Sequence, residues 1–428
     1  MKKMVFVFFV LVVSFSTALA METTFSPRVA VTEEYTDNVD LTSENGQEDF
    51  ITTSGVGAAL GFRGATAELS LAYNPEYAAY KNNSDLNSWR HFASMDAHWQ
   101  IARQTHLRLN DSLMVSDDPA DESETSIDRR GRNRYMRNSA HGEISHQFGR
   151  EDSVELGYDY TLLNNQLEDV EDSQSERPYA DLVWWFSQNE YAFQAHLDHT
   201  RSVFDRSDNF RSWFGDFRLR KRFTRHFDMF LQYAHMVTVY DKDPYAEDIA
   251  VVEDYVVYNP GVGFNYVAGE HTNISVAVGY ALRDREFSED DEGPTIISDL
   301  TTVIPYRRGT ITLNANSGYT QDTFSSDNRG FNVYAAAGAR AEYGFTSRFL
   351  GDVAAGYHFI RYLDEDPKVN EQLVSAGPGL SYQALPWMRF RLEYTYRVLL
   401  SDEPENEYAE NRAMISMILE PSSPYRWN

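Results

Sequence analysis

The run His196-Leu197-Asp198-His199 is the one stretch of this sequence whose residue types could bind a metal ion or exchange protons. Imidazole nitrogens and carboxylate oxygens are common zinc ligands and general acid–base groups. On a β-strand, however, His196 and Asp198 share one face and His199 points to the other, so the three side chains cannot converge on one ion. We therefore predict no metal site and no catalytic residue here, and expect these side chains to join a polar network.

Other sources of chemistry are equally sparse. The chain has no cysteine, which excludes disulfides, thiolate metal ligands and cysteine nucleophiles. No serine lies in the context of a hydrolase nucleophile elbow. The acidic run from Ser288 to Gly293 is rich in oxygen ligands but lacks the spacing of a calcium-binding loop. A solvated acidic loop is the preferred interpretation, with loose binding of divalent cations as the alternative. We expect no enzyme and no cofactor.

The composition narrows the class of protein further. The 428 residues include 38 Lys+Arg and 65 Asp+Glu, which gives a formal net charge of −27. So acidic a chain is a poor partner for phosphate backbones, and nucleic acid is excluded. With 27 Tyr and 26 Phe, the chain is also far too aromatic to be a disordered acidic polymer.

The first twenty residues predict a signal peptide. Lys2 and Lys3 form a basic start, Val5 to Phe15 an apolar stretch, and Ala18-Leu19-Ala20 a small-residue cleavage site. The apolar stretch is shorter than the roughly 20 residues of a membrane-spanning helix. We therefore expect an exported protein with residues 1–20 removed and residues 21–428 forming one domain. No later stretch resembles a transmembrane helix, which leaves a soluble secreted protein or an outer-membrane β-barrel.

Alternation with a period of two residues dominates the chain from residue 26 onward. Between Met388 and Val398 the even positions are apolar, whereas the odd positions hold Arg389, Arg391, Glu393, Thr395 and Arg397. Successive side chains of a strand point to opposite faces, so this segment has one apolar and one charged face. Segments near residues 154–162, 213–220, 274–282 and 311–319 repeat the pattern. Gly261-Val262-Gly263 and Gly377-Pro378-Gly379 fall in such strands, where glycine marks a bulge or a close backbone approach.

The connections between these strands are of two kinds. Nine are short, centred near residues 64, 103, 150, 189, 225, 269, 308, 346 and 386, and the others are longer and mostly acidic. Short turns at one rim and long loops at the other are typical of outer-membrane barrels. We predict an all-β fold, a transmembrane antiparallel up-and-down β-barrel of about 18–20 strands with short periplasmic turns and long acidic extracellular loops. A secreted β-sandwich or solenoid is the alternative.

Three short runs resemble a known family. They are Pro27 to Asn38, Leu71 to Tyr77 and the tail Pro421 to Trp427. They are similar to the outer-membrane beta-barrel porin type 2 family, which accompanies exopolysaccharide and exosortase gene clusters in Gram-negative bacteria. The resemblance implies an outer-membrane barrel for polymer secretion or diffusion, with periplasmic polysaccharide-export proteins as partners. It carries no catalytic residues.

The expected lumenal face supplies the candidate site residues. By alternation, the pore-lining candidates are Arg218, Arg220, Arg389, Arg391, Arg397, Asp216, Glu393, Arg340, Glu342, Tyr179 and Trp185. The arginine pairs on two strands could steer an anionic sugar, or they could brace the wall by pairing with carboxylates, which we favour. Tyr179 and Trp185 are candidates for sugar stacking. Aromatic residues of the opposite face are expected to form interfacial girdles, namely Trp89, Trp99, Trp184, Trp213, Tyr394 and Tyr396.

These observations lead to a ranked set of functions. The first is a channel in the outer membrane of a Gram-negative bacterium that secretes an exopolysaccharide, a role that rests on the family resemblance alone. The second is a general diffusion porin for small solutes, and the third an outer-membrane enzyme acting on lipid or glycan. Outer-membrane lipid and lipopolysaccharide are expected neighbours. No loop is long enough to predict an elaborate inward-folded constriction.

Overall fold

The computed structural model describes residues 21–119, 131–167, 170–241, 253–269, 271–322 and 329–427. The signal peptide predicted for residues 1–20 lies outside them. Most of the described residues form strands: β1 (Glu22–Thr36), β2 (Asp49–Arg63), β3 (Ala67–Tyr80), β4 (Ser88–Ala102), β5 (Thr105–Ser116), β6 (Tyr135–Gln147), β7 (Ser153–Asn165), β8 (Ser173–Phe186), β9 (Tyr191–Phe204), β10 (Phe210–Arg222), β11 (Phe227–Tyr240), β12 (Tyr255–Ala268), β13 (Thr272–Arg285), β14 (Asp291–Tyr306), β15 (Gly309–Gln321), β16 (Phe331–Gly344), β17 (Phe349–Tyr362), β18 (Val369–Leu385), β19 (Met388–Ser401), β20 (Tyr408–Leu419) and β21 (Tyr425–Trp427). Two short 3-10 helices, η1 (Ser84–Leu86) and η3 (Pro404–Asn406), lie in connections.

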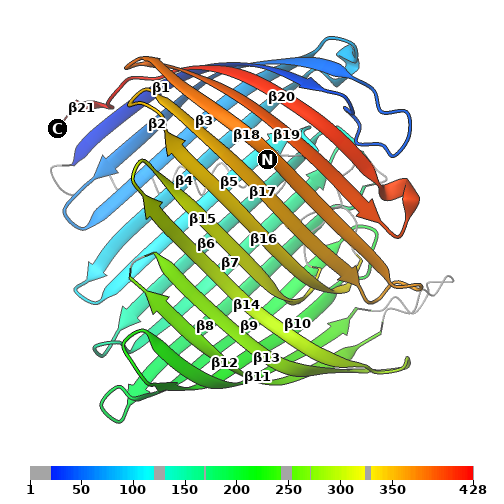
Figure 1. The fold of residues 1–428 in the computed structure, drawn as a ribbon. Coiled ribbons are helices and arrows are strands. Elements are labelled where there is room, and N and C mark those ends of the chain that lie inside the picture. Colours follow the sequence, from blue (N-terminus) through cyan, green and yellow to red (C-terminus); the bar gives the residue numbers. More distant parts are fainter. Residues whose placement is uncertain are drawn as a thin grey trace.

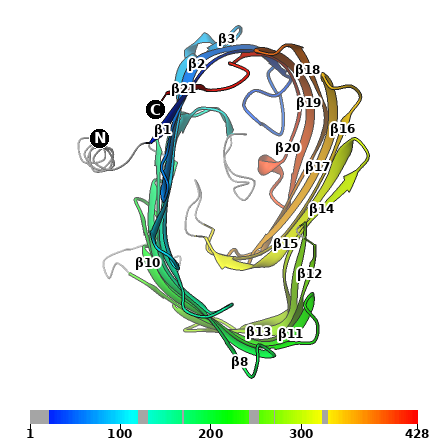
Figure 2. The same ribbon diagram turned by 90° about the vertical axis from the view of Figure 1, so that its left-hand side faces the viewer.

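The strands close into a barrel. Each strand from β1 to β20 pairs antiparallel with the next along the chain, and β20 pairs with residues 29–36 of β1. The short β21 extends the closure by pairing with residues 23–25 of β1 (Figure 1). The described strands therefore form a closed up-and-down barrel of twenty strands, which confirms the upper value of the predicted range. Seen along its axis, the barrel is elongated rather than circular (Figure 2).

Alternation along the strands separates an apolar outer face from a polar inner face. In the middle of β13, Val278 is 53% exposed whereas Ala277 is 4% exposed, and on β11 the same contrast holds between Leu231 and Phe230. Apolar side chains cover the outside because a barrel in lipid meets hydrocarbon there, while the lumen holds water. The aromatics predicted for interfacial girdles are all exposed on the outer face: Trp89, Trp99, Trp184, Trp213, Tyr394 and Tyr396. Among the described residues, no helix is long and apolar enough to span a membrane.

The two rims differ as the sequence predicts. All nine connections that the sequence indicates as short are turns at one rim, and the ten longer connections lie at the other. One loop is shorter than predicted. The acidic run from Ser288 to Gly293, which the sequence indicates as a loop, belongs in part to β14, and the connection spans only residues 286–290. The strands continue because Arg283 and Arg285 of β13 each lie 3.5 Å from the Asp291 carboxylate of β14, so opposite charges hold the two strand ends together.

The lumen is not uniformly open, because the wall formed by β9 to β12 carries large side chains on its inner face. Near the outer rim these residues pack into an apolar cluster with the start of β16. Its buried members are Phe204, Phe210, Met236, Tyr240, Tyr255, Val257 and Phe331. An apolar cluster inside a barrel has little water to contact, so this part of the interior is packed like a core.

Candidate functional site

The inner wall surrounds a cavity of about 880 Å³ that extends from one side of the barrel to the other. Residues of β5 to β11 line one side of it, and residues of β15 to β17 line the opposite side. Its charged lining includes Asp159, Arg177 and Asp198, and the imidazole of His358 lies on the opposite side. A second cavity, of about 380 Å³, lies along β3 to β6 and shares Arg137 with the first. A lumen with both signs of charge and many hydroxyls suits hydrated solutes.

The run that opened the sequence analysis lies on β9, and its side chains divide as predicted. His196 and Asp198 share the inner face, with His196 Nε2 3.1 Å from Asp198 Oδ2 and Nδ1 2.9 Å from Asp181 Oδ1. His199 points outward and stacks on Trp213 with ring centroids 4.8 Å apart. Within the described part of the chain, no three His, Asp or Glu side chains form a metal-binding group. The inward side chains instead build a polar network.

That network continues to β6 through Tyr179, one of the predicted stacking residues. Its ring lies between two imidazoles, with centroids 6.2 Å from His141 and 6.0 Å from His196. The Tyr179 hydroxyl donates a hydrogen bond of 3.3 Å to Glu155, and His141 Nδ1 lies 2.7 Å from Asp159 Oδ1. The inner face of β6 to β9 therefore presents alternating rings and carboxylates, which can bind hydrogen-bonding or cationic groups. Contact of Tyr179 with a sugar stays a prediction.

The arginines of β10 face inward but are engaged by the wall. Arg218 pairs with Asp216 at 2.8 Å, and its guanidinium lies 4.9 Å from the centre of the Phe230 ring. Arg220 pairs with Asp228 at 2.7 Å. Their side chains are only 21% and 18% exposed. This geometry fits bracing of the wall, the interpretation favoured from the sequence, better than steering of an anionic solute.

Trp185 also faces inward, but its ring is covered. The guanidinium of Arg222 lies 3.7 Å from the ring centre and that of Arg220 5.3 Å away. Arg222 is itself held by Glu151 at 2.7 Å. With 7% of Trp185 exposed, the two arginines occupy the place that a sugar would take. The proposed stacking role of Trp185 does not fit this arrangement, and its contact with the arginines is a cation–π contact within the wall.

A second set of predicted residues forms a network on β16 to β19. Arg391 donates to Asp352 at 3.0 Å and to Glu393 at 2.8 Å, and Asp352 also accepts a bond from Arg340 at 3.1 Å. Asp352 and Arg391 lie on strands separated by β18, where Gly379 stands between them. A Cβ at Gly379 would lie 2.8 Å from Asp352 and 2.9 Å from Arg391. The glycine therefore leaves the room that this cross-strand ion pair needs, and the close neighbours are side chains rather than the backbone approach predicted from the sequence.

Two arginines of this wall remain open to the lumen. Arg340 is 47% exposed and pairs with Glu342 at 3.2 Å, and Arg389 is 41% exposed and pairs with Glu420 at 3.3 Å. Arg397 lies on the same face of β19 and is half-buried. Exposed ion pairs contribute little to stability, so these side chains are free to contact solutes. Their role in selectivity remains a prediction.

The outer mouth departs from the sequence prediction, because the connection 37–48 between β1 and β2 folds into the barrel (Figure 2). Leu41 is 4% exposed and adopts a φ of 52°, a left-handed conformation that costs a non-glycine residue about 1–2 kcal/mol. Burial of its side chain offsets that cost. Its packing partners lie far along the sequence, on β17 to β20, and are Ile360, Tyr362, Val369, Leu399 and Tyr408. This inward-folded connection departs from the sequence-based expectation, which disfavoured an elaborate constriction.

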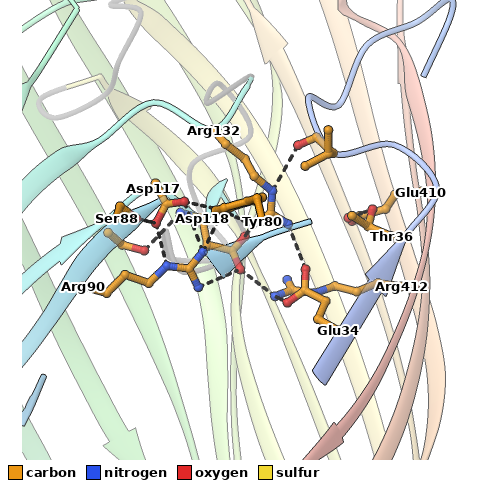
Figure 3. A network of polar contacts seen from close by, with 12 residues as sticks. Glu34, Thr36, Tyr80, Ser88, Arg90, Asp117, Asp118, Arg132, Glu410 and Arg412 are labelled. Atoms are coloured by element: carbon orange, nitrogen blue, oxygen red, sulfur yellow. Dashed lines mark hydrogen bonds and ion pairs between the residues drawn. The ribbon is translucent and has the colours of Figure 1, made fainter. Parts of the chain in front are cut away.

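The connection 117–134 between β5 and β6 is tied to this inward loop by one arginine. Arg132 donates to Glu34 at 2.9 Å, to the backbone oxygen of Val39 at 3.1 Å and to the Tyr80 hydroxyl at 3.3 Å (Figure 3). Its guanidinium also lies 3.6 Å from Asp118. The side chain is 2% exposed. A buried charge must be paired, so these contacts fix both loops against the wall.

Further ion pairs complete the cluster in Figure 3. Arg412 of β20 lies 2.6 Å from both Glu34 and Asp118, and Arg90 of β4 lies 2.6 Å from Asp117. Burial alone would raise the pKa of Asp117, but the hydrogen bond and charge of Arg90 hold that pKa below its usual range. We call Glu34, Arg90, Asp117, Asp118, Arg132 and Arg412 the mouth cluster.

A similar arrangement holds the ends of two other connections. Glu253, just before β12, lies 2.6 Å from Arg285 and accepts backbone hydrogen bonds from Phe287 at 2.7 Å and Ser288 at 2.9 Å. Burial alone would raise the pKa of Glu253, but the bonds from Ser288 and Phe287 and the charge of Arg285 lower it to about 2. The carboxylate is thus charged at any physiological pH and binds the connections together.

Another arginine joins the connections beside β16, β18 and β19. Arg329, just before β16, lies 3.4 Å from Glu371 at the start of β18 and also pairs with Glu403 in the connection before η3. Across the described mouth, buried arginines therefore bind several loop carboxylates.

A comparison with protein families identifies the class of protein to which this chain belongs. Residues 186–420 match the family described as "Putative beta-barrel porin 2". The chain belongs to this porin family. No curated protein sequence matches the chain. Its family consists of channels rather than enzymes, and the protein is an outer-membrane β-barrel porin of a Gram-negative bacterium.

Several solved structures are similar to this chain at low sequence identity. OpdK of Pseudomonas aeruginosa, crystallised with vanillate, is 12% identical, with 92% of this chain and 98% of that chain covered and a TM-score of 0.40. A BenF-like porin from Pseudomonas fluorescens Pf-5 is also 12% identical, with 92% and 98% covered and a TM-score of 0.41. OccAB3 of Acinetobacter baumannii is 9% identical, with 95% and 99% covered and a TM-score of 0.37.

Sequence reasoning missed the residues that shape the mouth. Alternation along β20 could have placed Glu410 and Arg412 on the inner face, since the apolar Ala409, Ala413 and Ile415 alternate with them. Arg132, in contrast, lies in an irregular connection, where no periodic signal exists. Only contact with Glu34, 98 positions away, reveals its role.

Proposed function

We propose that this porin is a passive channel for small hydrophilic solutes. The observation that carries the proposal is the combination of a polar lumen with an outer mouth narrowed by an anchored, inward-folded loop. The 37–48 connection contacts strands on both sides of the closure, through Leu41 on β17 to β20 and Val39 beside Ile51 and Tyr80. A bulky polymer would have to displace this loop, whereas a small solute can pass beside it.

The direct test is reconstitution. Purified protein should make liposomes permeable to monosaccharides and disaccharides, with swelling rates that fall steeply as the sugar becomes longer. Replacing residues 40–46 by Gly-Gly should raise single-channel conductance and the size limit, because it removes Leu41 from the mouth. Unchanged conductance in an assembled loop variant would contradict the role of this loop.

Charge inside the pore should set the preference among ions. Arg340 and Arg389 are the exposed lumenal arginines of the β16–β19 wall, so changing both to Gln should shift the reversal potential toward cation selectivity. Changing Arg103, an exposed residue of the short turn between β4 and β5, to Gln is the control and should shift it less. Equal shifts in both variants would mean that the lumenal wall does not control selectivity.

Export of an exopolysaccharide is the rival function, and it rests on the family resemblance. The phenotype of a deletion strain distinguishes export from diffusion. Loss of surface polysaccharide with retention of the intracellular precursor would favour export, and unchanged surface polysaccharide with reduced uptake of small sugars would favour the diffusion channel.

A further inference from the structure

The outer face of the barrel carries one pair of basic side chains placed directly opposite each other. Arg201 of β9 and Arg211 of β10 are register partners, and both are exposed. In the paired strands of the described residues, no other two Lys or Arg residues face each other. Like charges in direct cross-strand contact destabilise a sheet. This pair therefore differs from the rest of the wall, where basic residues face neutral or acidic ones.

The two guanidinium groups are incompletely neutralised by the protein. Arg211 lies 3.1 Å from Asp241, with both side chains about half exposed. Arg201 faces Glu176 on its other side, but Glu176 accepts a hydrogen bond of 3.1 Å from Gln174. No described carboxylate lies within ion-pair distance of Arg201. One full positive charge is therefore left for a ligand.

Their height on the barrel places the pair at the membrane surface. Arg211 is the second residue of β10, and Arg201 lies three residues before the end of β9. Strands of 14 and 13 residues exceed the roughly 9–11 residues that cross the hydrocarbon, so the outer few residues stand among lipid headgroups.

Aromatic residues slightly deeper along the strands than the arginine pair support its placement at the membrane surface. Trp213 and His199 stack at 4.8 Å about two residues deeper, and His235 and Tyr258 form a further ring contact on β11 and β12. Such aromatic residues mark the boundary between hydrocarbon and headgroups.

We propose that Arg201 and Arg211 bind the phosphate groups of lipopolysaccharide in the outer leaflet. Guanidinium groups form bidentate, charge-assisted hydrogen bonds with phosphate, and a dianionic headgroup placed between the two arginines removes their mutual repulsion. The aromatic residues beneath would then contact the sugar and upper acyl region of the same lipid.

The experiment measures binding of diphosphorylated lipid A to the purified barrel in detergent. R201Q/R211Q should bind about tenfold or more weakly than the wild type, since each charge-assisted bond contributes well over 1 kcal/mol. R361Q is the matched control, because Arg361 is an exposed arginine near the outer end of β17 that lies opposite Val333 and Asn370 rather than a second arginine. It should bind within about twofold of the wild type, because a single exposed charge contributes little. R201K/R211K keeps both charges, and its affinity for lipid A should lie between those of the wild type and R201Q/R211Q. This variant guards against loss of assembly in the double Gln variant.

Two other ligands identify the source of the phosphate. Dephosphorylated lipid A should lose most of the affinity, and inorganic phosphate at millimolar concentration should not compete. Equal binding by wild type and R201Q/R211Q, equal binding of dephosphorylated lipid A, or displacement by millimolar phosphate would each overturn the assignment.

Discussion

Replacement of Arg132 by Gln should release the inward loop at the outer mouth. Removing one partner from a buried ion pair typically costs about 3–5 kcal/mol. Glu34 and Asp118 keep Arg412 as a partner, so we expect the lower end, about 3 kcal/mol. Because 1.4 kcal/mol corresponds to a factor of ten, the population of the open loop should rise about 100-fold.

Hydrogen exchange measures this opening directly. The amide of Val39 donates to the backbone oxygen of Gln47 at 2.8 Å within the loop, and its exchange in the wild type reports loop opening. In R132Q it should exchange about 100-fold faster, while amides in the middle of β13 remain unchanged. R134Q is the matched control: Arg134 lies two residues further along the same connection and is exposed, so its removal should leave Val39 protected.

A double-mutant cycle with E34Q then tests the mechanism. Residues in direct ionic contact show coupling energies of about 0.5–3 kcal/mol, so the combined variant should lose less protection than the sum of the two single variants. If R132Q changes exchange of Val39 by less than about threefold, the loop is held by burial of Leu41 instead, and the role given to the mouth cluster is wrong.

Three further outcomes are expected. Leu392→Arg, on the lipid face, should destabilise the barrel by about 2–4 kcal/mol near the midplane, whereas Thr395→Arg, toward the lumen, should be nearly neutral; equal effects in unfolding titrations would contradict membrane insertion of this face. The stabilisation from Glu253, whose pKa is lowered to about 2, is present above about pH 4.5 and lost as the pH falls toward 2. The difference in thermal stability between wild type and E253Q should therefore be full at pH 6 and vanish near pH 2, and a constant difference would refute the charge contribution. N-terminal sequencing should find Met21 first in protein extracted from outer membranes with detergent, and the unheated protein should migrate differently from the boiled protein on gels.

The sequence predicts the wall of this barrel well because the wall depends on local information. Alternation is visible within each strand, and turns are visible within three or four residues. For this reason the nine short turns, the outward Val278 and Leu392, and the opposite directions of His196 and His199 could all be predicted. The same alternation identified Arg391 and Asp216 as lumenal, since parity along a strand fixes the face whatever the neighbouring strand contributes.

Contacts made across the lumen explain what alternation could not predict. Whether an inward arginine faces solute or wall depends on its cross-strand neighbours, as the exposure of Arg218 (21%) against Arg340 (47%) shows. Those neighbours follow from register, which a single sequence does not reveal.

The mouth requires information of still longer range. Arg412 and Asp118 are 294 positions apart, and they meet only because the last strand closes on the first and because Asp118, just after β5, is buried in the mouth. Closure brings β1 and β20 together, and this places Glu34 between Arg412 and Arg132. The connection 37–48 begins at the end of β1, directly beside the mouth cluster. It therefore enters the lumen next to the buried charges that hold Arg132. The constriction is thus a consequence of barrel closure, and it should depend on Arg412 as much as on the loop sequence itself.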